Sequence, residues 1–177
     1  TRCSRDWSSD VCSSDLLRRC APIYRVVLGF SMNCDADHMV RLNHQRVGEC
    51  LQAALAKAAV APAEVGYICA HGTGTVANDS NEYQAIEAVF GASPPPVSSI
   101  KSMMGHSMGA AAGFGAIACM LALSEGLPPT INVTEQDPHI PLDVVAQGFR
   151  AGKVDVVVNN AFAFGGNNSI LVFGNLK

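Results

Sequence analysis

The chain has 177 residues, of which 49% are hydrophobic and 15% charged, a composition typical of one ordered domain and not of a disordered protein. Its net charge of −3 gives no electrostatic reason to expect nucleic acid or an anionic membrane as a partner. The seven cysteines contain no CxxC pair and the histidines are scattered, which predicts reduced thiols and no metal. No apolar run approaches the roughly 20 residues of a membrane span, so we expect a cytoplasmic protein.

The first 16 residues differ in character from the rest of the chain. They contain the only tryptophan, Trp7, and two Ser-Ser-Asp repeats, and they follow neither a helical nor a strand period. The stretch from Asp6 to Leu16 also resembles a translated sequencing adapter. We therefore expect residues 1–16 to be a non-native segment, with a natural disordered terminus as the alternative, and exclude them from the prediction of the fold.

From residue 24 onward, strand-like and helix-like segments alternate. The run "YRVVLGFSM", residues 24–32, is apolar and β-branched and predicts a strand. In residues 45–60, apolar side chains recur at intervals of three and four, which predicts a helix with one buried face that is ended by Pro62. The apolar run "VGYICAH", residues 65–71, predicts a short buried strand.

A second helix is predicted for "DSNEYQAIEAVFG", residues 79–91. Asp79 with Glu82 three residues later matches a capping box at its start, and the glycine at position 91 provides its stop. The segment "PVSSIKS", residues 96–102, then predicts another short strand.

The last third of the chain predicts one helix and two strands. Small residues dominate 109–126, a composition suited to a helix that packs closely inside a larger body. Residues 154–162 and 168–174 predict two strands joined through Gly165 and Gly166 as a closing hairpin. Strands separated by helices predict a layered α/β fold with a mixed sheet.

Three loops at the ends of predicted strands carry chemically active side chains. They are "HGTGT" at 71–75, "KSMMGHSMG" at 101–109 and "NNAFAFGGNN" at 159–168. Strand ends are where α/β proteins present functional groups. Taken singly, each has an ordinary explanation, because a histidine at a strand end is more often structural than catalytic and a glycine-rich turn usually only turns the chain.

Taken together, these motifs resemble the β-ketoacyl-acyl-carrier-protein synthases, the ketosynthases of fatty acid and polyketide synthesis. The similarity runs from about residue 28 to 173 and includes "HGTGT" followed by "NDSNE", "KSMMGH", "LPPTIN" and Phe-x-Phe-Gly-Gly-x-Asn. The gap between the two histidines, 106 − 71 = 35, is also similar to that of the family. The resemblance implies a thiolase-like layered α/β fold in which residues 17–177 form the C-terminal half of a ketosynthase domain.

The resemblance also implies a reaction, the decarboxylative Claisen condensation of an acyl thioester with malonyl-acyl-carrier protein. His71 and His106 correspond to neutral imidazoles that hydrogen-bond the enolate oxygen formed when malonyl loses CO2. Lys101 corresponds to the lysine that sets the local electrostatics and supports the second histidine. No resident cofactor and no metal are implied, because the phosphopantetheine arm of the carrier protein enters as part of the substrate.

Other positions take supporting roles from the same resemblance. Thr73 and Thr75 correspond to hydroxyls that bind the phosphopantetheine arm. Phe164 corresponds to a gate, and Gly165 and Gly166 to a loop that swings beside it. Asp79 and Glu82 correspond to acidic residues of a supporting network. Two positions depart from the family, since Gly115 replaces a common glutamate and Ala163 a glycine. The expected partners are acyl carrier protein and a second ketosynthase-type subunit, as a homodimer or a heterodimer of the full-length parent.

The expected nucleophilic cysteine is missing. Cys12 lies in a Cys-Ser-Ser sequence, but its separation from the first histidine, 71 − 12 = 59, is far below the family spacing of well over a hundred residues. Cys50, Cys69 and Cys119 lie in predicted helix faces or a buried strand, where a structural thiol is expected. We therefore expect no nucleophile in this chain and no condensation by the chain alone.

Two rival functions remain. "GHSMG", residues 105–109, fits the G-x-S-x-G elbow of an α/β-hydrolase with Ser107 as nucleophile, but the only later histidine, His139, follows Asp137 by two residues and makes a poor triad. The second rival is a non-catalytic partner subunit of the chain-length-factor type, which resembles ketosynthases but lacks the cysteine. Retention of both histidines and Lys101 favours an active parent.

Overall fold

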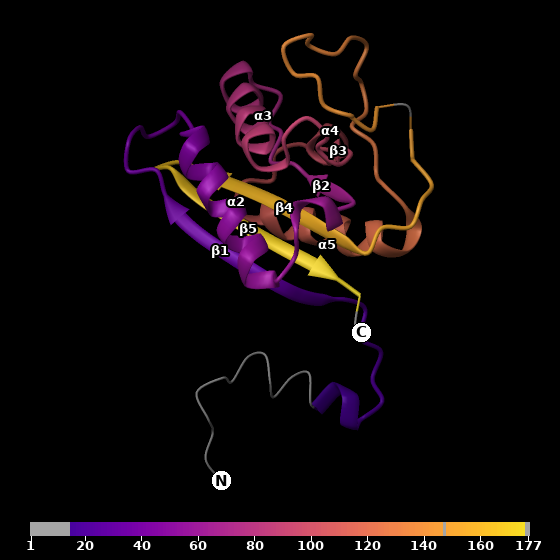
Figure 1. Ribbon diagram of the computed structural model, residues 1–177. Helices are drawn as coiled ribbons and strands as arrows, with labels where there is room; N and C mark the ends of the chain where they lie inside the picture. The colour runs from indigo at the N-terminus through magenta and orange to yellow at the C-terminus, as the bar shows by residue number, and fades with distance from the viewer. Residues whose placement is uncertain (1–14, 147, 176–177) are drawn as a thin grey trace.

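The computed structural model describes residues 15–146 and 148–175, so the predictions about Cys12 and about most of the segment 1–16 lie outside it. Five strands form one mixed sheet in the order β1-β5-β4-β2-β3 (Figure 1). β2 pairs in parallel with β3 and β4, whereas β5 pairs antiparallel with β4 and β1. The strands are β1 Val26–Cys34, β2 Tyr67–Cys69, β3 Val97–Ser98, β4 Val156–Ala163 and β5 Asn167–Gly174.

Helices cover both faces of this sheet, as predicted for a layered α/β fold. The helices are α2 His44–Ala58, α3 Val76–Phe90, α4 Lys101–Met104 and α5 Ala111–Glu125. Consecutive residues of β4 point to opposite faces: Val158 packs in a core with Leu51 of α2 and Ile86 of α3, and Val157 packs in a second core with Cys119 of α5. α2 and α3 therefore lie on one face of the sheet and α5 on the other.

The predicted helix at 45–60 is confirmed as α2, but Pro62 does not end it. Asn43 caps the start of α2 by accepting hydrogen bonds from two backbone N–H groups. The helix ends at Ala58, because Ala59 adopts a left-handed conformation with φ of 52° and its N–H bonds back to the last turn. Pro62 instead begins a separate 3₁₀ helix, Pro62–Glu64.

The helix predicted at 79–91 begins three residues earlier, and Asp79 and Glu82 do not form a capping box. Thr75 is the N-cap of α3, and its hydroxyl accepts from the Asn78 N–H. The Glu82 carboxylate is drawn away from the helix start because backbone N–H groups of the preceding loop bind it. The stop at Gly91 is confirmed, with φ of 66°.

The small-residue helix and the closing hairpin are confirmed as α5 and as β4 with β5. At the hairpin turn, Gly165 and Gly166 both have positive φ, 81° and 74°, which only glycine adopts without strain. The stretch Met108–Glu125 is, by length and composition, apolar enough to cross a membrane, contrary to the expectation that no such run exists. One side of it packs on the sheet through Ala118, Cys119 and Ala122.

Candidate active site

The loops that carry the two histidines meet at the C-terminal edge of the parallel strands. His71 follows β2 and His106 follows α4, and their ring centroids lie 5.6 Å apart with the ring planes at 82°. Both rings line a cavity of about 570 Å³, together with Phe162 and Phe164 from the end of β4 and the hairpin turn. The fold thus brings together three segments that are more than 30 residues apart in sequence.

His71 is held as a neutral ring with its hydrogen on Nε2. Its Nδ1 accepts a hydrogen bond from the backbone N–H of Phe162 at 3.3 Å and lies 3.4 Å from the Lys101 ammonium, so this nitrogen carries no proton. Burial of the ring, together with the positive charge of Lys101 and the nearby His106, lowers the pKa of His71 to about 3. The remaining nitrogen, Nε2, is therefore a hydrogen-bond donor at neutral pH.

His106 presents the same edge, although it is exposed. Its Nδ1 accepts the backbone N–H of Met108 at 3.1 Å, which assigns the ring hydrogen to Nε2. Met108 has φ of 49°, a left-handed conformation that is uncommon for a residue with a side chain. Two imidazole rings whose Nε2–H groups are free to donate therefore line one cavity.

Lys101 supports the first histidine, not the second as the resemblance implied. Its ammonium donates to the backbone carbonyl of His71 and contacts the Nδ1 of the same ring, and no hydrogen bond or ion pair joins it to His106 among the described residues. Burial lowers the pKa of Lys101, while the charge of Glu82 raises it. Lys101 therefore fixes the His71 loop and supplies positive charge beside the ring.

Glu82 anchors the His71 loop through hydrogen bonds to its backbone. Its side chain is only 3% exposed, and its carboxylate accepts the backbone N–H of His71 at 2.8 Å, that of Gly72 at 2.9 Å and the side-chain amide of Asn160 at 3.0 Å. Burial raises the pKa of Glu82, and these hydrogen bonds lower it. Asp79 accepts from the Gly74 N–H at 3.3 Å, so the two acidic residues hold neighbouring parts of one loop.

The remaining predicted site residues lie around the same cavity. Thr73 and Thr75 line it with their hydroxyls 2.9 Å apart, although Thr75 also caps α3. Phe164 lines the cavity and is 66% exposed, and Gly165 and Gly166 follow it with positive φ.

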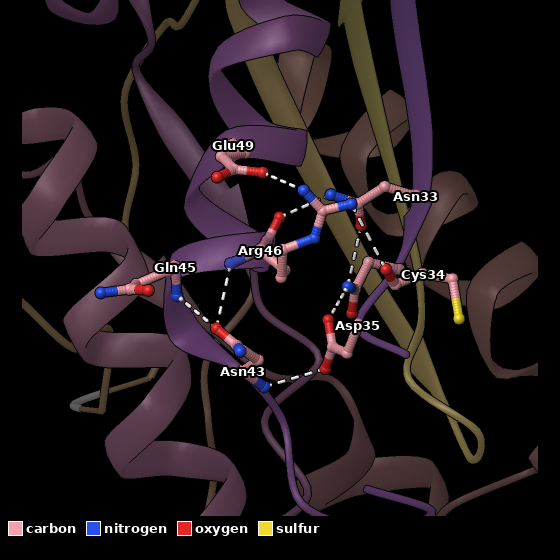
Figure 2. A network of polar contacts seen from close by, with 8 residues as sticks. Asn33, Cys34, Asp35, Asn43, Gln45, Arg46 and Glu49 are labelled. Carbon is pink, nitrogen blue, oxygen red and sulfur yellow. Dashed lines mark hydrogen bonds and ion pairs between the residues drawn. The ribbon is translucent and has the colours of Figure 1, made fainter. Parts of the chain in front are cut away.

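The segment 35–43 was missed by sequence reasoning, yet it lines the cavity and grips the hairpin turn. Figure 2 shows its polar network, in which the Asp35 carboxylate accepts the backbone N–H of Asn43 at 2.8 Å. The same carboxylate accepts the Asn168 side-chain amide at 2.6 Å, and the Asp35 N–H donates to the Gly166 carbonyl at 2.8 Å. The segment has no hydrophobic period, so only its fixed contacts in three dimensions reveal it.

The contact between the segment 35–43 and the hairpin turn is tight. A Cβ placed on Gly166 would lie 2.6 Å from the Cβ of Asp35, so only glycine fits there. The backbone N–H of Gly165 also donates to the Met39 carbonyl at 2.7 Å. Because Val40 and Leu42 line the cavity, this clamp couples one wall of the site to the loop that carries Phe164.

Replacing Asp35 with alanine is expected to lower the free energy of unfolding by about 1–3 kcal/mol, because the half-buried Asn43 N–H loses its acceptor and the buried Asn168 amide loses one of its two. Urea unfolding followed by circular dichroism measures the change. Asp37→Ala is the matched control, since within the described residues Asp37 forms only an exposed ion pair, with Arg41 at 3.7 Å. Equal stability of the two variants would contradict the clamp.

The low pKa of His71 makes stability depend on pH. The ring titrates at its ordinary value of 6.5 in the unfolded chain and at about 3 in the folded one, so between these values the unfolded chain binds the additional proton. The free energy of unfolding is therefore expected to fall as pH decreases from about 6.5 towards 3. Urea titrations across this range should give a steeper fall for the unaltered chain than for His71→Asn. Parallel curves would contradict a neutral, buried His71.

The hydrolase elbow around Ser107 does not form. In such an elbow a strand leads into a strained turn at the nucleophile. Here α4 precedes the segment, Ser107 has an ordinary φ of −77°, and no hydrogen bond joins its hydroxyl to a histidine in the part of the chain described. Among residues 15–146 and 148–175, the one hydrogen bond that joins His139 to Asp137 comes from the His139 backbone N–H and not from its ring. No triad is assembled.

Comparisons with known proteins agree with this geometry. Residues 24–134 match the family model described as Beta-ketoacyl synthase, C-terminal domain. The chain is 42% identical over 165 residues to the chloroplastic 3-oxoacyl-[acyl-carrier-protein] synthase I of Hordeum vulgare, covering 91% of this chain and 36% of that protein. It is likewise 42% identical over 160 residues to 3-oxoacyl-[acyl-carrier-protein] synthase 2 of Coxiella burnetii, covering 88% and 39%.

Solved structures give the same result. The ishigamide ketosynthase/chain length factor is similar with a TM-score of 0.90 and 46% identity, covering 93% of this chain and 41% of that one. A type II PKS ketosynthase in complex with its acyl-carrier protein has a TM-score of 0.87 and 31% identity, with the same coverage. These matches confirm the fold that the motifs implied. The chain spans only about two fifths of the length of the proteins it matches.

Proposed function

The chain belongs to the β-ketoacyl synthase family, and from this we propose that it supplies the decarboxylation side of the active site in a condensing enzyme that acts on malonyl-acyl-carrier protein. One observation carries the proposal: the rings of His71 and His106, each with its Nδ1 occupied as an acceptor, line one cavity with their centroids 5.6 Å apart. Two such donors suit an oxygen that becomes negatively charged during a reaction.

In the proposed first step, the bond between the malonyl carboxylate and C2 breaks and CO2 leaves. The electron pair stays on C2 and delocalises onto the thioester oxygen as an enolate. The two imidazoles donate their Nε2–H groups to this oxygen and keep their protons throughout. The low pKa of His71 supports this role, because a ring that is neutral at pH 7 keeps its Nδ1 for Phe162 and Lys101.

In the second step, C2 of the enolate attacks the carbonyl of an acyl thioester. A carbon–carbon bond forms, the carbon–sulfur bond breaks, and a cysteine thiolate is released. No cysteine of the described residues lines the cavity, so the nucleophile of the proposed enzyme comes from another part of the full-length protein. This chain by itself is therefore proposed to be inactive in condensation.

The other residues of the cavity take roles in binding the substrate. Thr73 and Thr75 are proposed to hydrogen-bond the phosphopantetheine arm, which enters as substrate so that no resident cofactor is required. Phe164 is proposed as the gate between acyl and malonyl binding, with Gly165 and Gly166 as its hinge. Acyl carrier protein is the proposed partner, as in the solved ketosynthase complex, within a homodimer or a ketosynthase-type heterodimer.

A non-catalytic partner subunit is the second candidate, because one similar structure is a ketosynthase/chain length factor pair. The two candidates differ in what they need at this cavity. A partner subunit requires no pair of donors aimed at a common oxygen, and no lysine beside one of them. The arrangement of His71, His106 and Lys101 therefore favours the condensing enzyme.

The test is release of CO2 from malonyl-acyl-carrier protein labelled in its free carboxylate. Residues 17–177 are joined to the N-terminal part of the Coxiella burnetii relative, and the intact relative serves as the control for assembly. We expect CO2 release by the folded chimera that exceeds the background without enzyme. A folded chimera that binds malonyl-acyl-carrier protein but releases no CO2 would refute the proposed function.

A further inference from the structure

Asn159 is a buried amide on β4 that the mechanism above does not use. Its side chain is 2% exposed, and in the parallel register it lies opposite Cys69, two residues before His71. The next residue, Asn160, points to the other face of the sheet and donates to Glu82. Because neighbouring residues of a strand point to opposite faces, Asn159 faces α5.

The Asn159 amide fits into the first turn of α5. Its Nδ2 donates to the carbonyl of Ala112 at 3.2 Å. A Cβ on Gly115 would lie only 2.3 Å from the Asn159 Oδ1, so the amide occupies the space that a side chain at 115 needs. Ala112 and Gly115 are three residues apart and lie on the same side of the helix. Gly115 and Asn159 are therefore complementary in shape, and only glycine allows this depth of contact.

The contact between Asn159 and α5 is connected to His106 through the segment that precedes α5. The 3₁₀ helix Met108–Ala110 runs directly into α5, and the Met108 N–H holds the His106 ring through Nδ1. A shift of the first turn of α5 away from β4 therefore moves the group that orients His106. His71, in contrast, is attached to β4 itself through the Phe162 N–H.

We propose that Asn159 is a positioning residue for His106, because its amide and the bare face of Gly115 set how deeply α5 docks on β4 and thereby the separation of the two imidazoles. The proposal rests on the proposed function, because only there does the separation of the two imidazoles matter for catalysis. In this arrangement, two consecutive asparagines of one strand hold the two histidine-bearing elements, Asn159 through α5 and Asn160 through Glu82.

The test uses the 177-residue chain with isotope-labelled histidine. Nuclear Overhauser contacts between the ring protons of His71 and His106 report their separation, and the nitrogen shifts of His106 report which nitrogen carries its hydrogen. Asn159→Ala is expected to weaken the contact between the rings and to disturb the Nδ1 acceptor of His106. Leu123→Ala is the matched control, because Leu123 is buried in the same helix away from its first turn and should leave both signals unchanged.

A second pair of variants tests the proposal through packing. Gly115→Ala is expected to lower the melting temperature, because the new methyl group collides with Asn159. Adding Asn159→Ala makes room for that methyl group, so the double variant should melt at least about 2 °C above Gly115→Ala alone. A double variant that melts no higher than the single one would overturn the proposed complementarity.

The outcomes separate this inference from the function on which it rests. If the unaltered chain shows no contact between the two rings, the proposed function fails first. If that contact is present and survives unchanged in folded Asn159→Ala, the proposed function stands and the positioning role is refuted. If the contact weakens equally in Leu123→Ala, general loosening of α5 explains the result and the specific role of Asn159 is refuted.

Discussion

Replacing His71 with alanine in the chimera that carries residues 17–177 is expected to lower the rate of malonyl decarboxylation by a factor of about 10² to 10³, the usual cost of losing one donor to a developing oxyanion. The ring is buried and pre-oriented, with Nδ1 fixed by Phe162 and Lys101, so its Nε2–H needs no reorganisation during the reaction. His106→Ala is expected to have an effect of the same order, because the second donor faces the same cavity. Release of labelled CO2 measures both.

Two further variants serve as controls for the histidine substitutions. His139→Ala removes an exposed histidine outside the cavity and should leave the rate unchanged. His71→Asn keeps a neutral side chain with an N–H donor and should retain more activity than His71→Ala. Decarboxylation that proceeds at the same rate in His71→Ala and in the unaltered chimera would remove His71 from the proposed chemistry.

Glu82→Ala is expected to lower the free energy of unfolding by about 3–5 kcal/mol, a loss typical of removing one partner from a buried charged network. The carboxylate is the common acceptor for the backbone N–H groups of His71 and Gly72 and for the Asn160 amide, and both His71 and Asn160 are buried. Urea unfolding by circular dichroism measures the loss.

The matched control for Glu82 lies five residues further along α3, at Glu87. Glu87 is exposed, and among the described residues its carboxylate accepts only the hydroxyl of Tyr83, so Glu87→Ala should change the stability by less than about 0.5 kcal/mol. If Glu82→Ala is as stable as Glu87→Ala, the carboxylate does not anchor the His71 loop. Glu82→Ala should also loosen the loop that presents His71, so the rate of decarboxylation should fall together with the stability.

Much of the fold follows from local patterns in the sequence. The buried face of α2, the small-residue composition of α5 and the glycine pair of the closing hairpin each predicted an element that the structure contains. Element ends were less predictable. The stop of α2 depends on the left-handed Ala59, a conformation that alanine rarely adopts, and nothing in the local sequence marks it.

The candidate site could be predicted only in part. The motifs "HGTGT" and "KSMMGH" indicated His71, His106 and Lys101, but not which histidine the lysine contacts, because that depends on how α4 packs against the β2 loop. Glu82 illustrates the same limit: its spacing from Asp79 fits a helix cap, whereas three-dimensional contacts assign it to the loop. The clamp of Asp35 on the hairpin turn has no sequence signal, since its partners there, Gly166 and Asn168, are more than 120 residues away.

The arrangement of the two rings also explains why a left-handed residue is kept beside the site. Met108 adopts φ of 49°, and in that conformation its N–H reaches the Nδ1 of His106. His71 is treated differently, with burial, a backbone N–H and a lysine all acting on one ring. Two distinct local arrangements therefore give the same result, an imidazole at the cavity whose Nδ1 is an acceptor and whose Nε2–H is left as a donor.

The most direct measurement is nitrogen NMR of the chain with labelled histidine near pH 7, which identifies the protonated nitrogen of each ring. For both His71 and His106 we predict hydrogen on Nε2 and a bare Nδ1, with His71 unchanged when the pH is lowered to about 5. A hydrogen on Nδ1 of either ring, or a doubly protonated His71 at neutral pH, would leave the cavity without its pair of neutral donors and contradict the account.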